Sequence, residues 1–146
     1  MENENSVKLL NALGKNVAMA TQSLELIIKD VKEEDFKTYL SKLSDEYNLI
    51  FKEIQMLAKA HDVDLKLTTP IEKAQLWTSI KLQTMFNKST RKFATMIYLG
   101  TNMGIPDLIF AISDFCDANK PIVELAKKLK DMEEKSNEDL KIFLSK

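Results

Sequence analysis

The stretch that decides the fold is IVELAKKLKDMEEKSNEDLKIF, residues 122–143. Every third or fourth residue along it falls on one helical stripe, and this stripe is apolar except at its centre. Glu133 and Ser136 stand there three residues apart, so a carboxylate and a hydroxyl interrupt a hydrocarbon face. Such a pair is either a small internal polar cluster or the remainder of a metal site. The stripe consists of Ile122, Ala126, Leu129, Glu133, Ser136, Leu140 and Phe143.

The composition favours a single all-α domain over residues 1–146. Three Gly and three Pro are too few for a fold with many tight turns, and they favour long helices. The formal net charge is −1 with no basic block, so we expect no nucleic-acid partner. No uninterrupted apolar run has the length of a membrane span, so we expect no membrane partner.

The cysteine content and the first residues bear on the cellular compartment. The single cysteine, Cys116, cannot form an internal disulfide, and no secretory leader pattern follows Met1. We therefore expect a cytoplasmic protein, and the bias toward Lys, Asn and Ile is typical of bacterial proteins from AT-rich genomes. Because Cys116 lies in an apolar segment, we expect it to be a small buried hydrophobe or to lie at an interface.

Stripes, caps and helix breakers predict five helical segments, at about 6–30, 33–61, 70–86, 88–117 and 120–144. Asn5 or Ser6 is expected to cap the first helix, and Pro106 is expected to kink the fourth. The segment 70–86 is expected to cross between two helical hairpins, although the pattern leaves open whether 70–103 is one helix or two. The predicted inward stripe of the segment 70–86 is Ile71, Ala74, Trp77, Ile80 and Met85.

Polar side chains also lie near the middle of the inward stripes predicted for the first two helices, 6–30 and 33–61. Thr21 lies on the first stripe and Tyr47 lies at the centre of the second. A buried carboxylate without a partner would cost several kcal/mol, and a buried phenol also needs a partner. We therefore predict that Tyr47 donates a hydrogen bond to Glu133, with Thr21 or Ser136 nearby.

Four long helices with a helical crossover resemble the ferritin-like superfamily, in particular its small bacterial members. The resemblance implies an up-down-down-up four-helix bundle. Metal-binding members place a Glu on each of two helices and a Glu-x-x-His on each of the other two. The matching positions here are Thr21, Tyr47-x-x-Ile50, Thr95 or Ile97, and Glu133-x-x-Ser136. The resemblance therefore implies the scaffold without di-iron chemistry, and we expect no cofactor and no metal.

The sequence favours a non-enzymatic structural or protein-interaction role. It has no Gly-rich phosphate loop and no GxSxG motif, and its only histidine, His61, belongs to a helix end away from Cys116. Residues 105–116 are apolar almost all round, so we expect this helix to mediate a homodimer, whereas the identity of any other protein partner stays open. The predicted interface residues are Ile105, Leu108, Ile109, Phe110 and Ile112.

Two alternative functions stay open at this point. A different set of carboxylates could rebuild an oxygen-rich site and give a carboxylate-bridged di-metal protein, which would bind metal or act as an oxidoreductase. Its ligands would be Glu133, Glu46 and Glu25, with Glu53 and Glu134 as further candidates. Alternatively, seven Met residues spread over the helices could line a cavity for an apolar small molecule or a partner helix.

Overall fold

The protein is all-helical, as the sequence predicts. The computed structural model describes residues 3–146 and contains no strand among them. Each of the five predicted helical segments is present, with its ends shifted by at most three residues, and 70–103 is divided between two helices. The helices are α1 Glu4–Ile28, α2 Glu34–Ala60, α3 Pro70–Thr84, α4 Thr90–Asp114 and α5 Lys120–Leu144.

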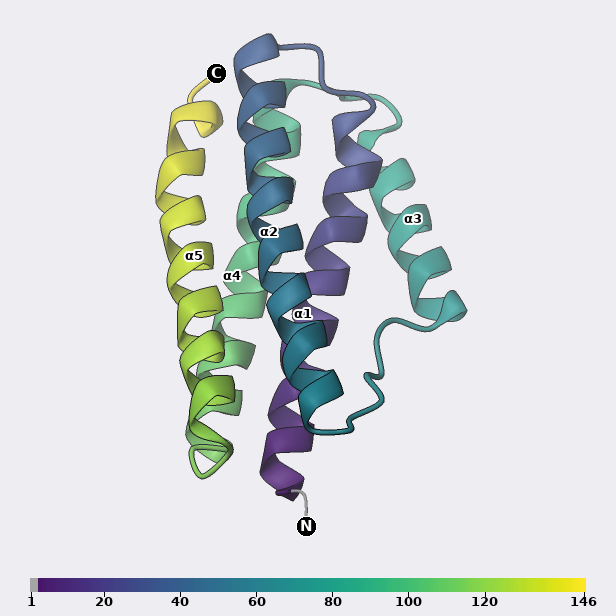
Figure 1. The fold of residues 1–146 in the computed structure, drawn as a ribbon. Helices are drawn as coiled ribbons and strands as arrows, with labels where there is room; N and C mark the ends of the chain where they lie inside the picture. Colours follow the sequence, from purple (N-terminus) through teal and green to yellow (C-terminus); the bar gives the residue numbers. More distant parts are fainter. Residues whose placement is uncertain (1–2) are drawn as a thin grey trace.

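The helices α1, α2, α4 and α5 lie side by side, and α3 lies outside them against α1 (Figure 1). From the N-terminus at the bottom of Figure 1, the chain rises through α1 and descends through α2. It then rises through α3, descends through α4 and rises through α5 to the C-terminus. The crossover therefore carries the chain along the length of the molecule before α4 begins.

Local signals explain where the helices begin. The hydroxyl of Thr69 accepts the N–H of Glu72, and the Glu72 side chain accepts the N–H of Thr69, so the capping box at α3 is complete. The prediction for α1 is wrong, because Asn3 is the cap and accepts the N–H groups of Asn5 and Ser6. Ser6 is fully buried instead, and its hydroxyl accepts the N–H of Asn119 in the turn before α5.

The core contains the whole predicted inner stripe of α5, whose seven residues are all buried. Gly14 gives space to the crossover, because a Cβ at this position would lie 3.0 Å from Cδ2 of Leu67. At the other end of the bundle the ring of Phe36 packs 4.8 Å from the ring of Phe143, between α2 and α5. Other fully buried large side chains are Leu9, Leu10, Leu13, Ile27, Leu40, Ile54, Phe93, Leu108, Ile122, Leu129 and Leu140.

The inward stripe predicted for α3 is mostly wrong. Ile80 and Thr84 are buried, whereas Ile71 and Trp77 are 71% and 51% exposed. Both sides of this helix are apolar, so its pattern could not identify the side that contacts α1. In the tertiary structure Ile80 and Thr84 are the covered residues, and ion pairs at both ends of α3 join Glu72 to Lys15 and Lys81 to Asp30.

Two predictions for the segment 105–116 are also wrong. Leu108 is 2% exposed and belongs to the core, so it is not available to an interface. Cys116 is exposed and lies just after α4, in the turn before α5, so its predicted burial is wrong, and a position at an interface stays a prediction. α4 itself continues through Pro106 as one helix. Among residues 3–146 it is the one helix whose length and composition would suit a membrane span, and only 11% of that window is buried.

Candidate functional site

A buried hydrogen bond joins Glu133 of α5 to Tyr47 of α2 at the centre of the bundle. The Tyr47 hydroxyl donates to Oε2 of Glu133 at 2.8 Å, which is the contact that the sequence predicts. Glu133 is 2% exposed and Tyr47 is 3% exposed. Both residues lie on the predicted stripes, so the register of α2 against α5 follows from the hydrophobic pattern.

α1 supplies a second donor to the same carboxylate. Nδ2 of Asn16 lies 3.4 Å from Oε1 of Glu133. The other amide atom of Asn16, Oδ1, is buried and has no hydrogen-bond partner among the described residues. The carboxylate therefore receives two neutral donors and faces an amide that has an acceptor to spare.

Burial sets the charge state of this group. Burial raises the pKa of Glu133 to about 7, and the hydrogen bonds from Tyr47 and Asn16 only partly oppose this rise. Burial, followed by the neighbouring carboxylate of Glu133, also raises the pKa of the Tyr47 hydroxyl well above its ordinary value. The Tyr47 hydroxyl therefore stays protonated and donates its hydrogen bond, whereas the Glu133 carboxyl changes between its protonated and ionised forms near neutral pH.

Ser136 belongs to a second polar contact one turn further along α5. The hydroxyl of Tyr39 lies 3.1 Å from both the hydroxyl and the carbonyl oxygen of Ser136. Next to it, the buried Asn137 donates to Oδ1 of Asn102 on α4. Sequence reasoning missed Asn16, Tyr39 and Asn137, because each is a polar residue beside a stripe, where a solvated position is the usual expectation.

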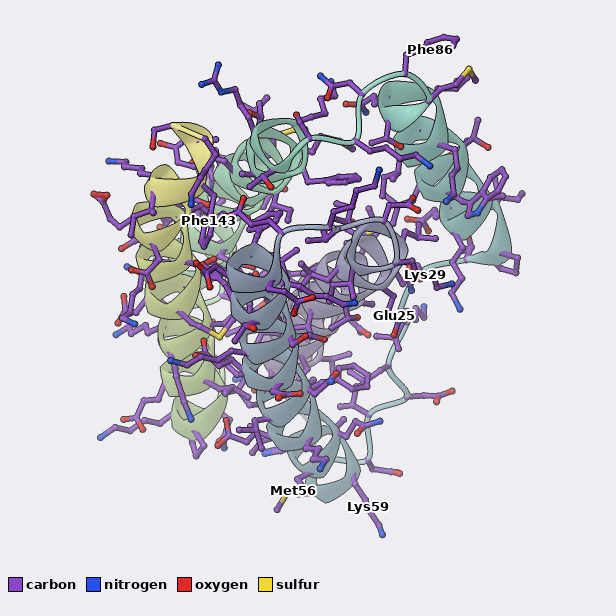
Figure 2. All side chains as sticks on the ribbon, turned by 90° about the horizontal axis from the view of Figure 1, so that it is seen from above. Glu25, Lys29, Met56, Lys59, Phe86 and Phe143 are labelled. Atoms are coloured by element: carbon purple, nitrogen blue, oxygen red, sulfur yellow. The ribbon has the colours of Figure 1, made fainter. Side chains whose placement is uncertain are left out.

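The remaining candidates do not join Glu133. The Thr21 hydroxyl donates to the carbonyl of Ala18 within α1 and not to Glu133. Glu25 is exposed on α1, where it points outward beside Lys29 (Figure 2), and Glu46 is half-buried. Within residues 3–146 no three His, Cys, Asp or Glu side chains gather in an arrangement that could hold a metal ion.

The two further carboxylates of the predicted metal set form ion pairs instead. Glu53 accepts Nζ of Lys128 at 3.2 Å, and Glu134 accepts Nζ of Lys130 at 3.3 Å. A metal bridging several carboxylates needs them on the inner faces of the helices, and here only Glu133 is buried in the described part of the chain. The cluster contains a single carboxylate, and its arrangement can hold one proton.

The glycines of α4 provide a test of how closely this helix approaches the cluster. A methyl group at Gly104 would lie 3.1 Å from Nδ2 of Asn16 and 3.7 Å from Oε1 of Glu133, whereas one at Gly100 would meet nothing within 4 Å. Gly104→Leu should therefore lower the free energy of unfolding by about 1–3 kcal/mol through overpacking. Gly100→Ala should raise it by about 0.5–1 kcal/mol, because alanine favours an exposed helix position.

Urea unfolding followed by circular dichroism measures both changes. Equal effects of the two substitutions would contradict the close approach of α4 to Asn16.

The second candidate site is the outer surface of α4. We call the set Leu99, Met103, Ile109 and Phe110 the α4 patch; these side chains are 57%, 75%, 46% and 61% exposed. Of the predicted interface residues, Ile109 and Phe110 are therefore on the surface, while Ile105 and Ile112 are half-buried. An exposed apolar patch of this kind is a candidate contact surface.

Comparison of the chain with protein-family models, curated proteins and solved structures found no match. The functional conclusions therefore follow from the sequence and the geometry of the two candidate sites.

Proposed function

We propose that this protein is a non-enzymatic helical bundle of ferritin-like architecture with a structural or protein-interaction role, and that it forms a homodimer through α4. The order of helix directions in Figure 1, with α1 and α5 opposed to α2 and α4, supports the ferritin-like arrangement. The single buried carboxylate at the centre supports the scaffold role, because a di-metal site requires several. The exposed α4 patch carries the proposal of self-association.

The spacing of the α4 patch suits a helix-to-helix contact. Leu99, Met103 and Phe110, together with the exposed Pro106, are separated by steps of four, three and four residues. This is the spacing of a seam that packs against a second helix. Burial of these side chains would remove a large apolar area from water on each chain, which is the main source of stability in homodimer interfaces.

Charges at the two ends of α4 favour an antiparallel pair of identical helices. Lys88, Arg91 and Lys92 surround its first turn, whereas Asp107 and Asp114 lie in its second half. In an antiparallel two-fold dimer the basic start of one α4 lies opposite the acidic end of the other. A parallel pair would instead place like charges together.

Static light scattering tests the homodimer. At tens of micromolar, we expect the unchanged protein to have twice the mass of the 16.7 kDa chain and the variant Met103→Glu to have the mass of one chain. Burying an unpaired carboxylate in the apolar seam is strongly unfavourable, so the dissociation constant should rise at least about a hundredfold.

The control is Met56→Glu, because Met56 is similarly exposed at 71% but lies on α2. This variant should remain a dimer. A monomeric unchanged protein, or equal dissociation of both variants, would contradict an interface on α4.

A further inference from the structure

The outer face of α3 is an apolar ridge that points away from the bundle. α3 packs against α1 through Ile80 and Thr84, which are 6% and 1% exposed. On the opposite side Ile71 and Leu82 are 71% and 63% exposed. A shallow depression along this outer side has no charged residue in its lining, which consists of Ile71, Ala74, Gln75, Thr78, Ser79 and Leu82.

The ridge ends in the most exposed large apolar side chain of the described residues. Phe86 is 95% exposed and stands just beyond the last turn of α3, next to Met85, which is 54% exposed. In Figure 2 Phe86 lies at the far tip of α3, away from the other helices. The ridge, which we define as Ile71, Leu82, Met85 and Phe86, therefore borders the shallow depression and extends beyond it to the tip of α3.

The chain around the ridge is strongly basic, in contrast to the rest of the protein. Residues 66–92 contain six Lys or Arg and one acidic residue, Glu72, so their net charge is +5. The whole chain has a net charge of −1, and the other residues therefore carry −6. Lys81 and Lys88 face Asp30 at 3.8 Å and 3.6 Å, while Lys66, Lys73 and Arg91 are exposed.

We propose that the α3 ridge binds the surface of an anionic lipid bilayer. Exposed large apolar side chains, with an aromatic ring at the tip of the helix, can enter the boundary between headgroups and acyl chains. Lysine and arginine around such a row attract the negative surface of anionic lipids. A protein partner would instead have to supply a groove for the ridge and an acidic rim for its lysines.

This contact differs from a membrane span. The expectation of no membrane partner depends on the lack of an apolar run as long as a span, and that criterion does not apply to a helix that lies in the bilayer interface. α3 remains attached to α1 through its buried side, so binding requires no unfolding of the bundle. The ridge is also separate from the α4 patch, and each proposal has its own variants.

The protein provides its own probe, because Trp77 is the only tryptophan and lies on α3 with 51% of its surface exposed. We expect its fluorescence emission to shift to shorter wavelength with vesicles of equimolar phosphatidylglycerol and phosphatidylcholine. The shift should be absent with pure phosphatidylcholine. It should also disappear as the salt concentration rises from about 0.05 M to about 0.5 M, because salt screens the attraction.

Two variants locate the contact, and sedimentation with the same vesicles measures the bound fraction. Phe86→Ser should weaken partitioning about tenfold, since it removes one large inserted side chain. Ile142→Ser changes a side chain on α5 that is 66% exposed and should leave binding unchanged. The monomeric α4 variant Met103→Glu should also bind, so failure of the dimer and failure of the lipid contact are distinguishable.

Several results would overturn the proposal. Equal binding to neutral vesicles would show that the basic residues do not contribute to the contact. Unchanged binding of Phe86→Ser would show that the ridge does not enter the bilayer. A Trp77 emission that changes with protein concentration in the absence of lipid would assign the ridge to a second copy of the chain. Loss of binding in Met103→Glu alone would place the lipid contact on α4.

Discussion

The variant Glu133→Gln should be more stable than the unchanged protein at about pH 8, by about 2 kcal/mol. The pKa of Glu133 in the folded protein is about 7, whereas its ordinary value is 4.5. Between these two values the folded state binds more protons than the unfolded state, so the free energy of unfolding falls as the pH rises. Below about 4.5 and above about 7 the contribution of Glu133 is constant, and the difference between the two levels is about 3 kcal/mol.

The geometry around Glu133 explains why an amide can replace the carboxylate. The new side chain keeps an oxygen that can accept a hydrogen bond from the Tyr47 hydroxyl. Its NH2 group can donate to the buried Oδ1 of Asn16 once the Asn16 side-chain amide flips, so that its oxygen and nitrogen exchange positions. The protonated form of Glu133 can use the same acceptor. The cluster is therefore better satisfied when Glu133 is neutral, either by protonation or by substitution.

The measurement is urea unfolding of the unchanged protein and of Glu133→Gln between about pH 4 and about pH 8. Other groups also change stability with pH; Lys15, for example, lowers the pKa of Glu72 and so gives the opposite sign. The difference between the two proteins isolates Glu133, and it should grow from about pH 4.5 to about pH 7. A difference that does not vary with pH would contradict a buried, titrating Glu133.

The control for this experiment is Glu134→Gln. Glu134 is the next residue on α5, its side chain is 47% exposed, and it pairs with Lys130 at 3.3 Å. An exposed pair of this kind contributes little to stability, so we expect a change within about 0.5 kcal/mol at every pH.

The largest effect on stability is expected from Phe36→Ala, which should lower the free energy of unfolding by about 3–5 kcal/mol. Phe36 is fully buried and its ring lies 4.8 Å from that of Phe143. Tyr39 packs against the same ring at 5.4 Å, so the substitution opens a cavity beneath an aromatic group that joins α2 to the end of α5. Surrounding side chains on two rigid helices can close such a cavity only in part.

Phe86→Ala is the matched control for this substitution. It deletes the same atoms at a position that is 95% exposed, so it creates no cavity and should change the free energy of unfolding by less than about 0.5 kcal/mol. Thermal unfolding followed by circular dichroism compares the two variants in one experiment. Similar losses of stability would contradict the placement of Phe36 in the core.

The central contact of the bundle could be predicted because two patterns constrain it at once. Glu133 lies on the inner stripe of one long helix and Tyr47 on that of another, and a buried carboxylate needs a donor. The period of the helix sets which residues face inward, and Glu133 is the one carboxylate on its stripe. The contribution of Asn16 could not be predicted, because its position beside a stripe also suits a solvated amide.

α3 shows where this reasoning fails. A helix with apolar residues on both sides has no preferred face in its sequence, and Ile71 and Ile80 are equally suited to burial. The packing of α3 against α1 covers the side with Ile80 and Thr84, and ion pairs with Lys15 and Asp30 of α1 accompany this orientation. Likewise, Leu108 and Phe110 of α4 are both large and apolar, but the position of α5 and α1 leaves only the second exposed.

The sequence alone determined the helical class, the five segments, the capping box at Thr69 and the inward direction of Glu133, because each depends on interactions within a few residues or on one strong period. Only the tertiary structure decided which apolar residues of α3 and α4 remain on the surface. Burial there depends on where separate helices come to lie, and a helix that is apolar on several sides can satisfy the same local pattern in more than one orientation.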